Sequence, residues 1–95
     1  MKKAFDDHRL GVFCCGHVFR MERAILLVCR DDGDWQFLCG QTDHGDSNEP
    51  YVVCVGELLK RDASLNEVAS VERDWEAERA RPGGQWIRTR ISPSN

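Results

Sequence analysis

Four thiol and imidazole side chains stand at spacings that could hold a metal ion: Cys15, His17, Cys39 and His44. Thiolate sulfur and imidazole nitrogen are the ligands that zinc prefers, and four of them complete the tetrahedral shell of a structural site. If the chain is extended around residue 15, Cys15 and His17 lie on the same face, because side chains alternate along a strand. This pattern indicates zinc binding as one hypothesis for the chain.

The same four residues resemble the ligand set of Rieske proteins, in which two cysteines and two histidines hold a two-iron cluster. The second half departs from that pattern, because the gap between Cys39 and His44 is longer than the Rieske spacing. The alternative to any ion is core packing, since both cysteines fall in apolar runs and unpaired cysteines are among the most buried residues. No cofactor is therefore expected, and zinc is the alternative.

Nucleophilic catalysis is a further possibility for these side chains. Cys15 or Cys39 would be the nucleophile, His44 its base, and Asp43 or Asp46 the group that orients the base. Such a nucleophile needs an exposed thiol of lowered pKa beside the base. No family-specific motif surrounds either cysteine, so the chain is expected not to be an enzyme.

Residues 41–50 are all polar, glycine or proline. Within them Asp43, His44, Asp46 and Glu49 form an acidic patch that suits a basic partner or, weakly, a divalent cation. Loops of this length are more often functional or mobile than short ones. The segment is predicted to be a binding loop, and a solvated loop without a partner is the alternative.

A hairpin organises the elements that must position these groups. Residues 24–30 and 35–40 are apolar and β-prone, and Asp32-Gly33 between them is a strong two-residue turn signal. Both faces of the first strand are apolar, which predicts a central strand covered on both sides. One face of the second strand carries Trp35, Phe37 and Cys39.

Three further strands are predicted, over residues 10–19, 51–55 and 86–91. Two short helices are predicted, over residues 57–61 and 65–71, the second opened by a capping box of Ser64 and Glu67. Residues 72–80 fit helix or strand equally. The resulting fold is α+β, a mainly antiparallel sheet of about five strands with one or two short helices on one face.

The length of 95 residues predicts a single domain, residues 1–95, with residues 1–8 as a frayed end. A net charge of −3 provides no basic field for nucleic acid, and no apolar run is long enough to span a bilayer. Five cysteines, an odd number, suit reduced thiols and a cytoplasmic location. Among the last residues, four arginines mixed with glutamates predict a solvated face: Arg79, Arg81, Arg88 and Arg90.

Several short motifs carry a resemblance: residues 32–40 (DGDWQFLCG), 15–19 (CGHVF), 43–44 (DH), 55–59 (VGELL) and 75–77 (WEA). Together they resemble a group of small bacterial proteins that is similar to an immunity-protein-like domain family of unknown biochemical function. The resemblance covers roughly residues 13–90 and implies an α+β domain that neutralises a toxin by direct binding. It implies no catalytic residue, and the four candidate metal ligands are not part of that family's pattern.

The function expected from these observations is a non-enzymatic, immunity-like, protein-binding domain that acts through the acidic loop and the sheet surface. A toxin-like protein would be its partner, with no role for nucleic acid or membrane. A small zinc-binding protein is the alternative. The oligomeric state does not follow from the sequence.

Overall fold

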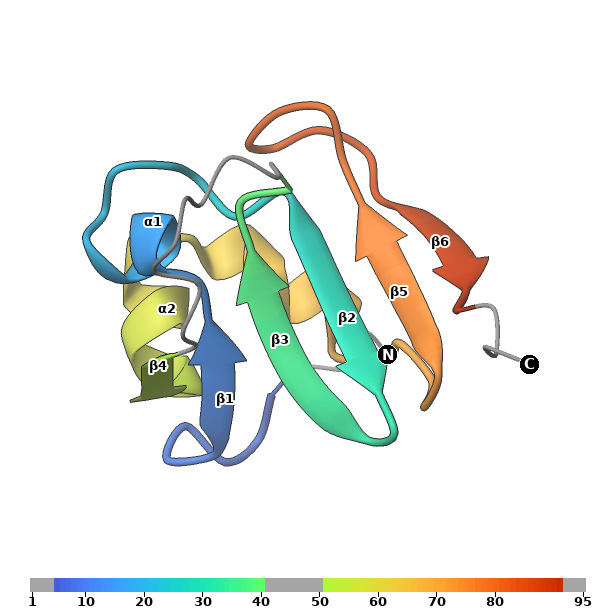
Figure 1. The fold of residues 1–95 in the computed structure, drawn as a ribbon, viewed down its shortest axis with the longest axis horizontal. Helices are drawn as coiled ribbons and strands as arrows, with labels where there is room; N and C mark the ends of the chain where they lie inside the picture. The colour runs from blue at the N-terminus through green and yellow to red at the C-terminus, as the bar shows by residue number, and fades with distance from the viewer. Residues whose placement is uncertain (1–4, 41–50, 92–95) are drawn as a thin grey trace.

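The computed structural model describes residues 5–40 and 51–91 (Figure 1). Within them, six strands form one sheet in the order β4-β1-β3-β2-β5-β6. The strands are β1 (Gly11–Cys14), β2 (Leu27–Asp31), β3 (Asp34–Leu38), β4 (Tyr51–Cys54), β5 (Trp75–Glu78) and β6 (Ile87–Arg90). The helices are α1 (Gly16–Phe19), α2 (Val55–Arg61) and the 3₁₀ helix η1 (Ala63–Val68).

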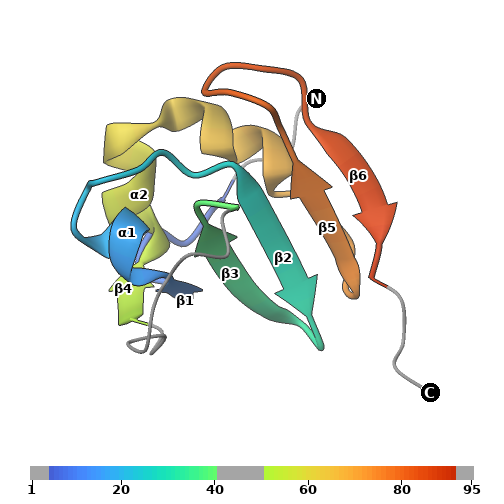
Figure 2. The same cartoon turned by 45° about the horizontal axis from the view of Figure 1, so that its top comes forward.

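The sheet is antiparallel at every pairing except that of β1 with β3, which is parallel. Both α2 and η1 lie behind the sheet in Figure 1, so that the strands face the viewer. The predicted α+β class with short helices on one face is therefore confirmed, with one strand more than expected. Figure 2 shows from a second direction that α2 and η1 form one layer.

The predicted hairpin is confirmed, with β2 and β3 joined at Asp32-Gly33. Their φ angles are 53° and 89°, the positive values that a two-residue hairpin turn requires. The backbone NH of Asp32 also donates to Oδ1 of Asp74 at 2.9 Å, which ties the turn to the start of β5. The prediction that β2 is covered on both faces was wrong. Val28 is fully buried under the helices, but Leu27 and Cys29, which point to the other face, are only half-buried.

The core lies between the sheet and the helical layer. Trp35, Phe37 and Cys39 are all buried there, as their shared face predicts. The helical layer contributes apolar side chains at the positions that its periodicity predicts: Leu58, Leu65, Val68 and Ala69. Burying such side chains provides the main driving force for packing the two layers together.

The end of the chain that was expected to fray packs on this core from residue 5 onward. Phe5 is buried, its ring meets that of Trp35 edge-on at 5.1 Å, and its NH donates to Oδ1 of Asn66. The carbonyl of His8 accepts from the NH of Gly56 at 2.9 Å. An aromatic ring outside the predicted elements thus completes the core. Residues 1–4 lie outside the described part of the chain.

Two predicted elements differ from the structure. Residues 10–19 do not form one strand, because β1 ends at Cys14 and the chain turns through α1. That turn lets Val18 enter the core and redirects the chain toward β2, which runs opposite to β3. The prediction that Ser64 and Glu67 form a capping box was also wrong. Asp62 caps η1 instead, and its side chain accepts a hydrogen bond from the NH of Ser64 at 3.0 Å. The open choice at residues 72–80 resolves to the strand β5.

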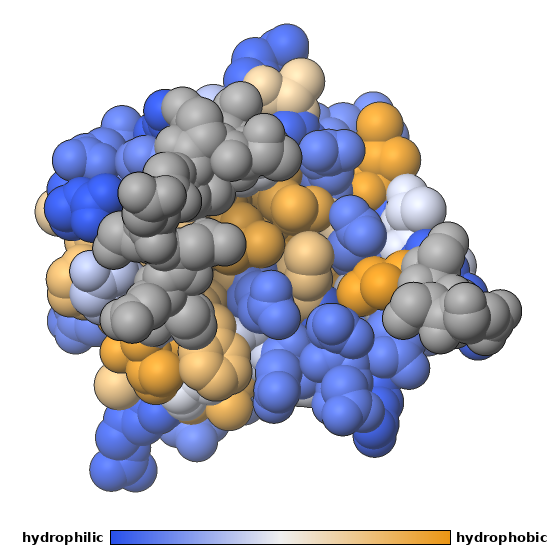
Figure 3. All heavy atoms as spheres, viewed as in Figure 1, coloured by the Kyte–Doolittle hydropathy of each residue, from blue (hydrophilic) through white to orange (hydrophobic). Residues whose placement is uncertain are grey.

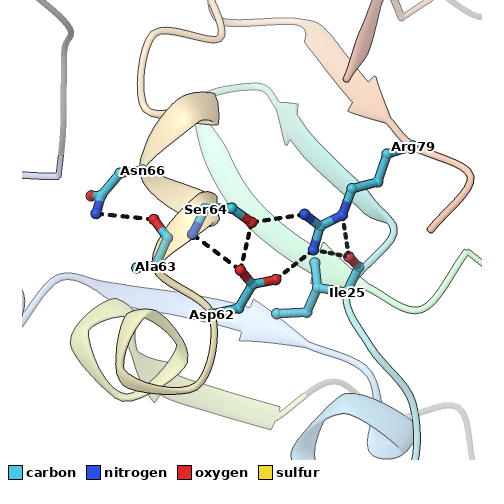
Figure 4. Close-up of polar contacts among 6 residues, drawn as sticks. All are labelled: Ile25, Asp62, Ala63, Ser64, Asn66 and Arg79. Atoms are coloured by element: carbon cyan, nitrogen blue, oxygen red, sulfur yellow. Dashed lines mark hydrogen bonds and ion pairs between the residues drawn. The ribbon is translucent and has the colours of Figure 1, made fainter. Parts of the chain in front are cut away.

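Arg79 is the clearest departure from the predicted solvated face, because it is only 3% exposed. Its Nε and Nη2 donate to the carbonyl of Ile25 at 3.1 and 2.8 Å (Figure 4). Its guanidinium also donates to Ser64 Oγ at 2.8 Å and to Asp62 Oδ2 at 2.5 Å. The guanidinium carbon of Arg79 also lies over the ring of Trp86, 4.3 Å from the ring centroid. This one side chain therefore joins the start of η1 to the sheet.

Candidate metal centre

Three of the four predicted metal ligands come together: the donor atoms of Cys15, His17 and Cys39 all lie within 4.8 Å of one another. Sγ of Cys39 is 3.7 Å from Nδ1 of His17. Around a tetrahedral zinc with Zn–S of about 2.3 Å and Zn–N of about 2.0 Å, neighbouring sulfur and nitrogen ligands are roughly 3.5 to 3.8 Å apart. The Cys39–His17 pair already has this separation, and the other pairs need to move closer by at most about 1.3 Å.

The parallel pairing of β1 with β3 explains why the two cysteines meet. In its register Cys14 stands opposite Phe37, so Cys15 follows directly after β1 and Cys39 follows directly after β3. The carboxyl ends of parallel strands reach the same edge of a sheet, and in Figure 1 the arrowheads of β1 and β3 point the same way. The strand order therefore places the two thiols side by side.

His17 reaches the thiols by a helical turn, not by the strand alternation that the sequence suggested. Cys15 is the extended residue before α1, and its carbonyl accepts from the NH of Phe19 at 2.9 Å. The carbonyl of His17 accepts from the NH groups of Glu22 and Arg23 at 2.8 and 3.3 Å, which closes the chain after α1 around it. The turn thus folds the imidazole back over the end of β3.

The centre is partly enclosed. Cys15 is 7% exposed and Cys39 is 1% exposed, whereas His17 is half-buried. An ion among the three would therefore be shielded on the sulfur side and reachable from the imidazole side. A buried thiol does not suit nucleophilic catalysis, which needs an exposed one. The geometry therefore favours metal binding over the Cys–His catalysis considered from the sequence.

Arg23 is a neighbour of this cluster that sequence reasoning missed. Its Nη1 lies 3.9 Å from Sγ of Cys39. The contact makes Arg23 a polar neighbour of the Cys39 sulfur, in addition to His17. No local motif marks Arg23 for this role, because the contact depends on the turn after α1.

The remaining cysteines lie apart from the centre or point elsewhere, and no disulfide joins any of the five. Burial raises the pKa of Cys14, and the neighbouring Cys15 raises it further. The pKa of Cys29 is raised to about 11, chiefly by burial and then by the charge of Glu76. Cys54 is exposed on β4. Cys54 and Cys29 are therefore natural controls for the thiols of the cluster.

The rest of the predicted site lies outside the described residues. This holds for the fourth candidate ligand, His44, and for the acidic residues of the proposed binding loop, Asp43, Asp46 and Glu49. The structure therefore brings together Cys15, His17 and Cys39 and leaves the contribution of residues 41–50 as a prediction.

Comparisons of the chain with protein-family models, with curated proteins and with solved structures find no match. Among the described helices, none has the length and apolar character needed to cross a membrane. What the chain does must therefore be argued from its own side chains.

Proposed function

We propose that this chain is a small zinc-binding protein in which Cys15, His17 and Cys39 supply three ligands. The observation that carries the proposal is the approach of their three donor atoms to within 4.8 Å. Two thiolates balance the charge of Zn²⁺, and one imidazole completes a sulfur-rich donor set that selects zinc over magnesium or calcium. His44 is the proposed fourth ligand, and water is the alternative in that position.

The proposed ion has a structural role. It would join the end of β1, the turn α1 and the end of β3, three segments whose other links are hydrogen bonds and a small core. Because the site forms only in the folded chain, the free energy of zinc binding adds to the stability of the fold. Zinc is thus proposed to hold the ends of β1 and β3 together, whereas Arg79 links the sheet to the start of η1.

Metal content tests this proposal directly. Reduced protein that is loaded with zinc and then dialysed is expected to retain one equivalent, measured by atomic emission. The Cys15→Ser variant should retain much less, because a neutral hydroxyl replaces an anionic sulfur ligand. Cys54→Ser, which changes an exposed thiol on β4, should retain as much as the unchanged protein. Equal zinc content in Cys15→Ser and the unchanged protein would contradict the proposal.

A second candidate function is favoured by a different observation, the sheet face opposite the helices. We propose that the chain also binds a protein partner, as its resemblance to immunity-like domains implies, in the bacterial cytoplasm and without catalysis. Support comes from Val52 and Ile87, apolar side chains that are 66% and 67% exposed on this sheet. The same proposal includes the predicted binding loop, with its acidic residues Asp43, Asp46 and Glu49 and its histidine, His44.

A further inference from the structure

Among the described residues, α2 and η1 both pack on one face of the sheet, and the strand register shows which side chains lie on the opposite face. Side chains alternate along each strand, so the neighbours of the buried residues Val12, Val28, Phe37 and Ala77 point away from the helices. The register then aligns them across the sheet: Val52 with Phe13, Leu38 with Leu27, and Leu27 with Glu78. We name this surface the helix-free face and define it by Phe13, Leu27, Leu38, Val52, Glu76 and Glu78.

The strand residues of the helix-free face combine apolar contact area with carboxylates, and Arg73 pairs with Asp32 at the hairpin turn beside them. Asp31 and Asp34, paired across the hairpin, share it with Glu76 and Glu78. Among the strand residues that the register places on this face, none is Lys or Arg. Figure 3 shows apolar residues in the middle of this side of the molecule, with hydrophilic residues below them. The pKa of Cys29, raised by burial and then by Glu76, Asp31 and Glu78, reports the same negative field.

A pocket of about 360 Å³ opens where β2 begins and β5 ends. Its lining includes the apolar side chains of Leu26 and Ile87 and the carboxylate of Glu78. Cys39 and Arg79 also line it, and the guanidinium of Arg79 donates to Asp62. Glu78 stands opposite Ile87 in the register of β5 and β6, so the pocket continues the helix-free face. A hollow of this kind accepts a long aliphatic side chain with a cationic end, which is the structure of lysine and arginine.

We propose that the helix-free face is the docking surface for a protein partner that presents lysine or arginine side chains around an apolar contact. This inference rests on the second proposed function and specifies the surface and the chemistry of that partner. Opposite charges steer such an encounter and select against acidic partners, while the apolar side chains supply the contact area. Nucleic acid and anionic lipid carry the wrong charge for this face.

The test is a titration of isotope-labelled protein with two designed amphipathic peptides, one of leucine and lysine and one of leucine and glutamate. Backbone amide shifts in the NMR spectrum locate the contact. The lysine peptide is expected to shift the amides of Leu27, Gln36 and Glu76 in a saturable way that weakens with added salt. The glutamate peptide is expected to bind at least about tenfold more weakly, because it meets like charges.

Two variants sharpen the result. The double substitution Glu76→Lys with Glu78→Lys should weaken binding of the lysine peptide by at least about tenfold. Glu67→Lys is the matched control, because Glu67 is an exposed residue of η1 in the helical layer. It should leave the affinity within about twofold of the unchanged value. The salt dependence of lysine-peptide binding to the unchanged protein tests the role of charge without requiring any variant to fold.

Three results would overturn the assignment of this face: shifts confined to α2 and η1, equal binding of both peptides, or no shifts at all. Shifts confined to α2 and η1 would still support a protein partner, but would place its binding site on the helical layer. The third would count against both. Zinc content, measured separately, decides the metal proposal in every case.

Discussion

Replacement of Arg79 by methionine is expected to lower the free energy of unfolding by about 2 to 4 kcal/mol. The variant loses the hydrogen bonds to Ile25, Ser64 and Asp62, and it leaves buried acceptors without their donor. It also loses the contact of the guanidinium with Trp86. Urea unfolding of the two proteins measures the difference. Arg81→Met is the control, because Arg81 is exposed and should change stability by no more than about 0.5 kcal/mol.

The pH dependence of stability provides a second signature of the same contact. Burial opposes ionisation of Asp62, but hydrogen bonds from Ser64 and Arg79 outweigh it and lower the pKa of the carboxyl. A lowered folded-state pKa contributes stability that is present above the usual carboxyl pKa and is lost as the pH falls through the folded value. Arg79→Met should therefore lose less stability on acidification than the unchanged protein. Equal stability of Arg79→Met and Arg81→Met would contradict this role.

Replacement of Cys39 by serine is expected to lower the affinity for zinc by at least about 100-fold, or roughly 2.8 kcal/mol. Cys39 is the most buried of the three ligands and lies 3.7 Å from Nδ1 of His17. A serine hydroxyl there is a poor ligand for zinc, because it is neutral where a zinc-bound thiolate is anionic. Competition with a chromogenic chelator measures the affinity.

Two thiols outside the cluster control for a general effect of removing sulfur. Cys54→Ser changes an exposed thiol, and Cys29→Ser changes a half-buried one whose pKa is about 11. Both should keep the zinc affinity of the unchanged protein within a few-fold. A loss in either of them as large as that in Cys39→Ser would place the ion elsewhere.

Local signals predicted most of the fold. The turn at Asp32-Gly33 needs positive φ at both residues, and aspartate followed by glycine provides it at little cost. The alternation of Trp35, Phe37 and Cys39 predicted their burial because it depends only on the strand itself. The burial of Leu58 in α2 and of Leu65 in η1 was also predicted from apolar residues a few positions apart, although the two residues belong to separate helices. Each of these features is set by residues a few positions apart.

The departures depend on contacts between distant segments. Arg79 follows Glu78 and looks like part of a solvated face, but its partners are Ile25, Asp62 and Ser64. The turn after Cys14 depends on where β2 must begin, which residues 10–19 alone do not encode. In both cases tertiary packing overrides what the local pattern favours.

The structure brings together three of the four residues that the sequence singled out as metal ligands, by a geometry that the sequence did not predict. Cys15, His17 and Cys39 were chosen by residue type, and a shared strand face was expected for Cys15 and His17 only. They meet instead because β1 and β3 are parallel, so that Cys15 and Cys39 follow the same ends of adjacent strands. Parallel pairing of β1 with β3, which are neighbours in the sheet but are separated in the sequence by β2, has no local sequence signal. Arg23 could not be found for the same reason.

X-ray absorption at the zinc edge of the loaded, reduced protein tests the central claim most directly. The structure predicts a four-coordinate ion with two sulfur ligands at about 2.3 Å and nitrogen or oxygen ligands at about 2.0 to 2.1 Å. The sulfur signal should fall by half in Cys39→Ser. A six-coordinate shell of oxygen and nitrogen alone would contradict binding by Cys15, His17 and Cys39.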